Sequence, residues 1–260
     1  LSGRSSSKYS DYNSKRNKHQ KYERNTTPKD ELTSTNNKEK NQDSMVKKKI
    51  LESRYEWVSS RKRIGGSDAA AVLGLNPYKS NIELWYEKKE KRVPEDISDK
   101  DYVKYGIAAE NHLRELFKLD YPGYEVLYDE NNIYVNSKFP FAHASLDGEL
   151  VEKDTGRQGI LEIKTTNILQ SMQKENWQGK IPENYYVQVL HYLMVTEYDF
   201  AVLKAQLKSV FNDEIYIQVR HYFIEREDVA DDIEYLKNEE NKFWESLKMT
   251  SPPNLLLPEI

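Results

Sequence analysis

The stretch "ASLDGELVEKDTGRQGILEIKTT", residues 144–166, decides the expected fold. Residues 142–152 and 159–166 are rich in apolar and β-branched residues that alternate with polar ones, a pattern typical of β-strands. The tetrapeptide "DTGR" at 154–157 lies between them and has the composition of a tight hairpin turn. We therefore expect two neighbouring strands joined by this turn.

Three charged residues lie on this hairpin: Asp147, Glu162 and Lys164. Because side chains alternate along a strand, Glu162 and Lys164 point to one face, while Leu161 and Ile163 point to the other. The turn brings Asp147 back beside Glu162. Two adjacent carboxylates repel each other unless a cation lies between them, and Mg²⁺ prefers carboxylate oxygens. Taken alone, however, the pattern favours an ordinary edge strand with solvated charges, because this chain is rich in Asp, Glu and Lys.

The rest of the chain alternates between helical and strand-like patterns. Ser67 and Ser80 are predicted N-caps, and Ser80 has Glu83 at capping-box spacing. The mixed order predicts an α/β (α+β) fold with a central mixed β-sheet flanked by helices. Helices are expected at 68–73, from Ser80 onward, and at 103–119, 183–196 and 226–248; further strands are expected at 124–129, 132–136, 199–207 and 213–225.

Two of these helices carry polar residues that could face the hairpin. Glu110 lies near the start of the helix at 103–119. Gln188 and Tyr192 are four residues apart, so they share one face of the helix at 183–196. The apolar residues expected to pack the helix at 103–119 on one side are Ile107, Leu113, Leu116 and Phe117.

Composition sets the domain organisation. Residues 1–44 contain too few apolar side chains to offset the entropy of ordering them, so we expect a disordered polar tail or a cloning remnant. Met45 is the expected start of the compact protein. Residues 45–260 are enough for a single domain with one sizeable core.

Several classes of protein are excluded by composition. The absence of cysteine excludes disulfides, thiolate nucleophiles and cysteine-ligated metals, and it agrees with a reducing cytoplasm. The longest apolar runs are too short to cross a bilayer, so we expect an intracellular, cytoplasmic protein without a membrane partner. The net charge is -4, and the first 50 residues are basic. The remainder is therefore acidic, and any binding of nucleic acid requires a local basic patch or metal ions.

Five motifs occur in a fixed order between about Trp57 and about Thr196: "W…R…IGGSDAAAVLGLNPYKS", "GIAAE", "ASLDG", "LEIK" and "QVLHY". Together they resemble the YqaJ-like viral recombinases, the family of lambda exonuclease, within the PD-(D/E)xK nuclease superfamily. The resemblance implies a restriction-endonuclease-like core and a single nuclease domain. Leu146 replaces the proline of the superfamily name, a departure that is frequent in this superfamily.

The resemblance also implies a metal site. Asp147 and Glu162 would be the principal ligands of Mg²⁺, for which Mn²⁺ would substitute. The backbone carbonyl of Ile163 would add an oxygen, and Glu110 would help to bind the metal or its waters. Lys164 would be the catalytic lysine.

Further positions would contact DNA. By resemblance, Gln188 belongs to a catalytic motif near the scissile phosphate, with Tyr192 one helical turn away. Arg61, Ser67 and Ser145 match positions that bind a terminal 5′ phosphate, and arginine is well suited to bind phosphate.

Three neighbouring residues qualify these assignments. Asp68, an acid in the first helical turn, would compete with a phosphate for the helix dipole. His143 has the same strand parity as Asp147 but is expected to be a packed or surface residue, and His191 is expected to be structural.

The function that follows is metal-dependent hydrolysis of linear double-stranded DNA. By resemblance, digestion runs 5′ to 3′ and leaves 3′ single strands for an annealing protein or recombinase, and the enzyme is a ring-shaped homotrimer. Two alternatives stay open: a RecB-like or restriction-type endonuclease of the same superfamily, and a non-catalytic module that binds DNA ends or docks proteins.

Overall fold

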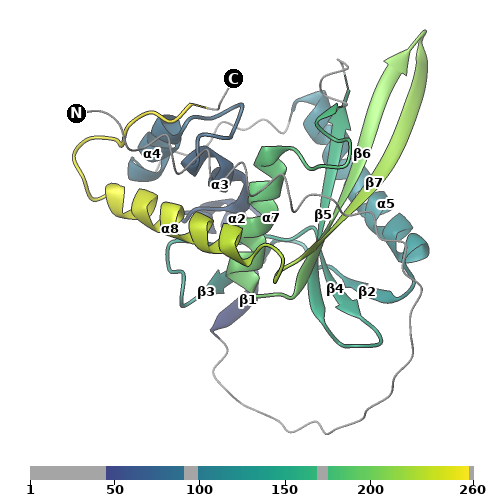
Figure 1. Ribbon diagram of the computed structural model, residues 1–260, viewed down its shortest axis with the longest axis horizontal. Coiled ribbons are helices and arrows are strands. Elements are labelled where there is room, and N and C mark those ends of the chain that lie inside the picture. Colours follow the sequence, from purple (N-terminus) through teal and green to yellow (C-terminus); the bar gives the residue numbers. More distant parts are fainter. Residues whose placement is uncertain (1–44, 91–98, 169–174, 258–260) are drawn as a thin grey trace, which may run out of the picture.

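A computed structural model describes residues 45–90, 99–168 and 175–257. Residues 1–44, for which a polar tail is expected, lie outside the described residues. The central feature is a five-stranded sheet with the order β2-β4-β5-β6-β7 (Figure 1). Strands β5 and β6 are parallel and the other pairs are antiparallel, which confirms the expected mixed sheet. The strands are β2 (Tyr124–Leu127), β4 (Gly148–Glu152), β5 (Gln158–Asn167), β6 (Phe200–Phe211) and β7 (Glu214–Glu225).

A small second sheet pairs β1 (Val46–Ile50) with β3 (Asn132–Asn136) in antiparallel register. The sequence "VKKKI" of β1 lacks the alternation that identifies a strand, so β1 was not expected. The short helix α2 (Arg54–Ser60), also not expected, begins after Ser53, whose side chain accepts a hydrogen bond from the amide of Glu56.

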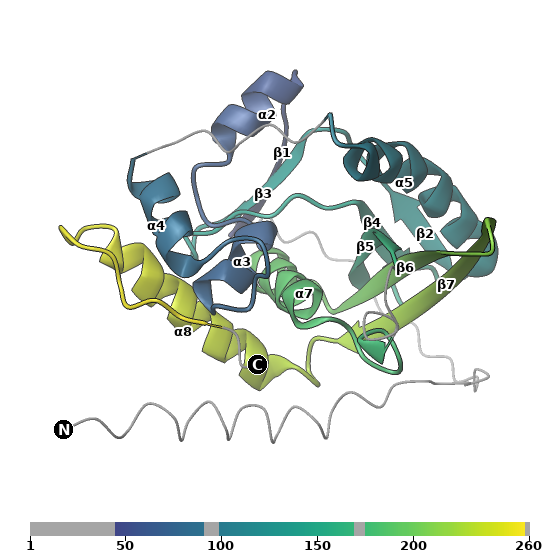
Figure 2. The ribbon, with the colours of Figure 1, turned by 90° about the horizontal axis from the view of Figure 1, so that it is seen from above.

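Helices cover both faces of the large sheet (Figure 2). The larger apolar cluster lies on the side of α7 (Glu183–Thr196), which also contacts α3 (Gly66–Val72) and α8 (Ala230–Ser246). Helix α4 (Asn81–Lys89) packs on α3. A smaller cluster forms on the opposite face, beneath α5 (Asp101–Asp120). These two layers confirm the expected sheet core flanked by helices.

Helix α3 begins earlier than expected. Its N-cap is Gly65, not Ser67, and the carboxylate of Asp68 accepts a hydrogen bond from the Gly65 amide at 3.1 Å. The neighbouring Gly66 is required by packing, because a Cβ atom there would lie 2.3 Å from Cε1 of Tyr192. By contrast, the capping box predicted at the start of α4 is present.

The strand expected at 142–152 is also shorter, and β4 begins only at Gly148. Ala142 and Ala144 form isolated bridges instead. The cause is Asn132, whose side chain accepts a hydrogen bond from the amide of Leu146 at 2.8 Å and donates one to its carbonyl at 2.9 Å. These bonds take the place of a regular ladder next to Asp147.

Helix α5 buries a narrower face than its apolar spacing predicts. Leu113 and Phe117 are buried in the smaller cluster, whereas Ile107 and Leu116 are 56% and 48% exposed. The sheet covers only part of the helix surface, so the prediction for these two residues was wrong. Within the described residues, no helix has the length and apolar character needed to cross a membrane.

Candidate active site

The β4–β5 hairpin places Asp147 next to Glu162. The turn is the expected one: Gly156 has φ 72°, and the amide of Glu152 donates to the carbonyl of Arg157 at 3.0 Å. Gly148 then pairs with Leu161 across the two strands, so Asp147 lies level with Glu162. The position of Asp147 is fixed further by the amide of Ile163, which donates to its Oδ2 at 2.9 Å.

Lys164, Gln188 and Tyr192 join this pair of acids. Lys164 Nζ lies 2.6 Å from Oε1 of Glu162. Gln188 Nε2 donates to the same oxygen at 2.8 Å and to the hydroxyl of Tyr192 at 2.8 Å. Because Tyr192 also packs against Gly66, the start of α3 borders the site. The structure therefore brings five of the expected residues together from β5, α7 and the segment before β4.

The pKa values of Asp147 and Glu162 are raised, so the positive charge around them does not fully neutralise the pair. Glu162 is 1% exposed, and burial, followed by the charge of Asp147, raises its pKa to about 8. Burial also raises the pKa of Asp147. For Lys164, burial alone would lower the pKa, but the charges of Glu162 and Asp147 outweigh burial and raise it. Within the described part of the chain, Oε2 of Glu162 is buried and has no hydrogen-bond partner.

Glu110 of α5 is linked to the site by Arg114, a residue that the sequence analysis did not identify. Arg114 Nη2 contacts Oε1 of Glu110 at 2.5 Å, and its Nε donates to the backbone carbonyl of Asp147 at 2.7 Å. Burial and then the charge of Asp147 raise the pKa of Glu110 to about 7. The signal was present in "ENHLR", because an acid and a base four residues apart face each other on a helix.

The expected phosphate-binding residues are only partly brought together. The guanidinium of Arg61 lies 4.4 Å from the ring centroid of Trp57, and Trp57 Nε1 donates to Ser145 Oγ at 3.1 Å. Arg61 Nε is buried and lacks a hydrogen-bond partner among the described residues. Ser67 is exposed on α3, and no hydrogen bond in the described chain joins it to Arg61 or Ser145. Trp57 was part of the sequence motif, but its linking position was not foreseen.

The residues beneath this region form a buried polar layer. Lys88 Nζ lies 2.7 Å from Asp68 Oδ2. Burial would raise the pKa of Asp68, but Lys88, the Gly65 amide and Lys79 together outweigh burial and lower it. Lys88 thus balances the charge that was expected to compete with a phosphate. His143 is 2% exposed, and His191 lies between Glu240 Oε1 at 2.7 Å and the carbonyl of His143 at 2.8 Å. Both histidines are packed, in agreement with expectation.

The donor set of Asp147 and Glu162 fits a hard divalent cation. Two adjacent carboxylates with raised pKa values and one unpartnered buried oxygen are the groups that such a cation would satisfy. In residues 45–90, 99–168 and 175–257, no three His, Asp or Glu side chains form a ready metal site. The pair would therefore need backbone oxygen and water as further ligands, which is usual for Mg²⁺.

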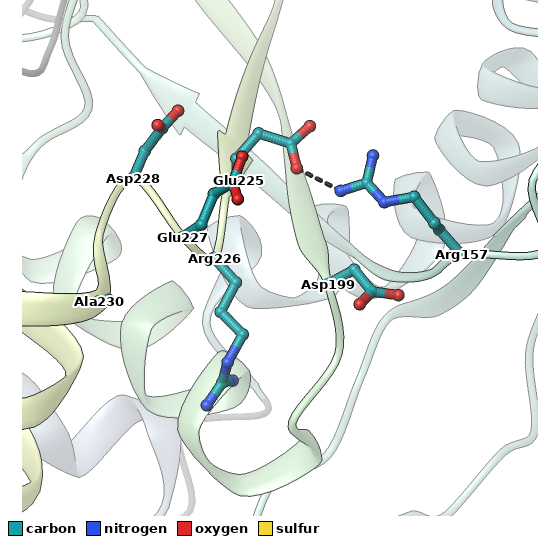
Figure 3. A pocket seen from close by; sticks show the side chains of 7 residues that line it. All are labelled: Arg157, Asp199, Glu225, Arg226, Glu227, Asp228 and Ala230. Atoms are coloured by element: carbon teal, nitrogen blue, oxygen red, sulfur yellow. Dashed lines mark hydrogen bonds and ion pairs between the residues drawn. The ribbon is translucent and has the colours of Figure 1, made fainter.

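A separate cavity of about 640 Å³ lies at the other end of β5 (Figure 3). It is bordered by Arg157, just before β5, and by Asp199, just before β6. Arg157 forms an ion pair with Glu225 there. The cavity contains none of the residues expected at the active site. The full lining is Arg157, Asp199, Glu225, Arg226, Glu227, Asp228 and Ala230.

Known structures share this fold. An alkaline exonuclease (LHK-Exo) from Laribacter hongkongensis superposes with a TM-score of 0.55 at 21% identity, covering 75% of this chain and 92% of that one. Its complex with dAMP gives a TM-score of 0.52 at 17% identity, over 75% and 92% of the two chains. At these identities the likeness concerns the fold.

Sequence comparison identifies the family. The protein YqaJ of Bacillus subtilis (strain 168), described as uncharacterized, is 35% identical over 198 residues, which cover 74% of this chain. This chain spans only about half of that relative, 56% of its length. The model of the YqaJ-like viral recombinase domain matches residues 56–199, the region that holds every expected site residue. The chain therefore belongs to the YqaJ-like viral recombinase domain family.

Proposed function

We propose that this protein is a metal-dependent deoxyribonuclease that hydrolyses phosphodiester bonds at the ends of linear double-stranded DNA. The observation that carries the proposal is the adjacent pair of Asp147 and the buried Glu162, with Lys164 Nζ 2.6 Å from Glu162. Family membership and the fold shared with LHK-Exo, which has been crystallised with dAMP, support the same activity.

The metal would be Mg²⁺, with Mn²⁺ as a substitute. Asp147 and Glu162 would hold it, together with the carbonyl of Ile163, and Glu110 would contribute from α5. When bound, such an ion supplies positive charge against the phosphate and makes water more acidic.

The chain's own residues orient the reacting groups. Lys164 is an ammonium group fixed by its ion pair with Glu162, so it supplies a positive charge to a phosphate or orients the attacking water. Gln188 is held between Glu162 and Tyr192, and its amide would then lie near the scissile phosphate. Exclusion of water by the buried α7 strengthens these interactions.

The terminal 5′ phosphate would bind to Arg61, with Ser145 and Ser67 contributing hydroxyl groups. Arg61 is suited to this role because its guanidinium is held against Trp57 while Nε has no hydrogen-bond partner among the described residues. Digestion would then run 5′ to 3′ and leave 3′ single strands for an annealing protein or recombinase. A homotrimeric ring would keep the enzyme on its DNA.

The activity is tested with linear duplex DNA labelled at either the 5′ or the 3′ ends, with and without Mg²⁺. We expect early release of the 5′ label, only with Mg²⁺, while closed circular DNA stays intact. Cleavage of the circle would favour an endonuclease of the same superfamily. Binding of ends without hydrolysis would favour a non-catalytic module.

The phosphate pocket is tested with Arg61→Ala on duplexes that end in either a 5′ phosphate or a 5′ hydroxyl. We expect slower digestion of phosphorylated ends only. Arg54→Ala is the matched control, because Arg54 also lies over the Trp57 ring, at 5.4 Å. Equal loss on both kinds of end would contradict the pocket.

A further inference from the structure

Arg114 is a buried cation whose nitrogen atoms are all engaged. The side chain is 4% exposed. Nε donates to the carbonyl of Asp147 at 2.7 Å, Nη2 contacts Glu110 at 2.5 Å, and Nη1 lies 3.4 Å from Oδ1 of Asn111. The face of the guanidinium lies 3.6 Å from the ring centroid of Tyr128. A planar group held in this way has little freedom to move.

These contacts connect two layers of the fold. Glu110 belongs to α5, which covers one face of the sheet, whereas Asp147 precedes β4 and is bonded to β5 through the Ile163 amide. The contact with Asp147 is made to its backbone carbonyl, so Arg114 fixes the chain at this residue without engaging its carboxylate. Arg114 therefore sets the position of one acid side chain and the main chain of the other.

The same contacts argue against a direct role for Arg114 in binding DNA. A phosphate ligand needs exposed donors, but the guanidinium is buried and directs its three nitrogen atoms to protein oxygens. Its positive charge nevertheless lies among acids that repel one another. The charge of Asp147 raises the pKa of Glu110, and the charge of Arg114 opposes this shift.

We propose that Arg114 is a positioning residue that holds Glu110 at a fixed distance from Asp147 and thereby sets the affinity of the site for Mg²⁺. This inference rests on the proposed function of the site. Residues that support metal ligands from behind typically contribute 10- to 100-fold to metal affinity or activity. Arg114 would act in this way on ligands from both α5 and the sheet.

The test compares Mg²⁺ binding, measured by calorimetry, with the Mg²⁺ concentration for half-maximal hydrolysis of linear duplex DNA. For Arg114→Met we expect Mg²⁺ affinity to fall by about 10- to 100-fold, with activity partly recovered at high Mg²⁺. Arg114→Lys keeps the charge but not the planar fork, so its Mg²⁺ affinity should be intermediate. Arg157→Met is the matched control, because Arg157 also contacts an aromatic ring, Phe200 at 5.2 Å, and a carboxylate, Glu225, at the far end of β5.

A double-mutant cycle shows whether Arg114 acts through Glu110. In a Glu110→Gln background, Arg114→Met should lower Mg²⁺ affinity by less than it does in the wild type. An undiminished effect would overturn the inference. Two other results for Arg114→Met would also overturn it. A lower melting temperature with unchanged Mg²⁺ affinity would indicate a structural role. A raised KM for DNA with unchanged Mg²⁺ affinity would indicate that Arg114 contacts DNA.

The two proposals fail in different ways. If the wild type shows no Mg²⁺-dependent hydrolysis, the proposed function is wrong, whatever the variants do. If the wild type is active and Arg114→Met keeps the wild-type Mg²⁺ dependence, only the role of Arg114 is wrong.

Discussion

The two faces of strand β5 have opposite characters. Towards α5, Leu161 and Ile163 join an apolar cluster that is closed by Leu113 and Phe117. Towards α7, Ile160 is apolar, but the next residue on that face is the buried Glu162. One strand thus supplies apolar packing on one side and residues of the proposed active site on the other.

The difference shows how the fold offsets the free-energy cost of burying charged groups on β5. The apolar face gains free energy by burial. The polar face loses free energy by burying carboxylates, as the raised pKa of Glu162 shows, and recovers part of it through Lys164 and Gln188. Changes on the α5 face should therefore alter folding, whereas changes at the charged positions should alter chemistry.

The largest expected effect is on chemistry. Lys164→Ala should reduce hydrolysis by about 10²- to 10³-fold, because it removes a fixed positive charge next to the reacting phosphate, while DNA binding is retained. Single-turnover digestion and a gel-shift assay measure the two properties. Lys208→Ala, which removes a lysine placed over Tyr105 at 5.0 Å, should keep full activity. Wild-type turnover in Lys164→Ala would remove this residue from the mechanism.

The next effect is on folding. Leu161→Ala on the α5 face should lower the free energy of unfolding by about 2–5 kcal/mol, since it removes a fully buried side chain and leaves a cavity. Urea denaturation measures the change, and activity per folded molecule should stay close to that of the wild type. A loss below about 1 kcal/mol would mean that the apolar face is less important than its burial indicates.

The α5 face should also add a pH dependence to stability. Burial, and then the charge of Lys204, lower the pKa of His221 to about 4, with Asp120 opposing them. In the unfolded chain, His221 therefore becomes protonated below about pH 6.5, whereas in the folded protein it becomes protonated only below about pH 4. Stability should accordingly fall as the pH is lowered from 6.5 to 4. The full shift corresponds to about 3 kcal/mol, and because solvent screens this partly exposed group we expect about 1 to 2 kcal/mol from this residue.

Thermal unfolding of His221→Asn across this pH range tests the point. The variant should lose less stability than the wild type between pH 6.5 and 4. His112→Asn, which alters an exposed histidine of α5, should follow the wild-type curve. Parallel curves for all three proteins would contradict the assignment to His221.

The smallest effect should come from the apolar start of the α7 face. Ile160→Val removes one methylene from a fully buried position and should cost about 0.5–1.5 kcal/mol in unfolding free energy, with unchanged hydrolysis. Urea denaturation and the duplex assay measure both. A large loss of activity in this variant would show that the apolar residues of β5 affect hydrolysis as well as stability.

Local patterns were sufficient to predict much of this arrangement. The alternation of "GILEIKTT" gave the two faces of β5, and the turn "DTGR" brought Asp147 level with Glu162. The four-residue spacing of Gln188 and Tyr192 predicted that they share one face of α7, and the family resemblance predicted that this face borders the site. These features depend on periods of two and four residues, which can be read from the sequence.

Features that depend on tertiary contacts were not predicted. The shortened β4 results from the side chain of Asn132, which lies on a different strand, β3, 14 residues before Leu146. The start of α3 depends on Gly66 beneath Tyr192, and the role of Arg114 requires α5 to lie against the segment before β4. Secondary-structure propensity and residue spacing contain no information on contacts between separate elements of the fold.

The most direct test of the central claim is the metal dependence of hydrolysis by the wild type and by Asp147→Asn on linear duplex DNA. The proposed site predicts that the wild type digests DNA with Mg²⁺ or Mn²⁺ and stops when EDTA is added, and that folded Asp147→Asn is inactive with either metal. Digestion that continues in EDTA, or wild-type rates for Asp147→Asn, would contradict a metal held by Asp147 and Glu162.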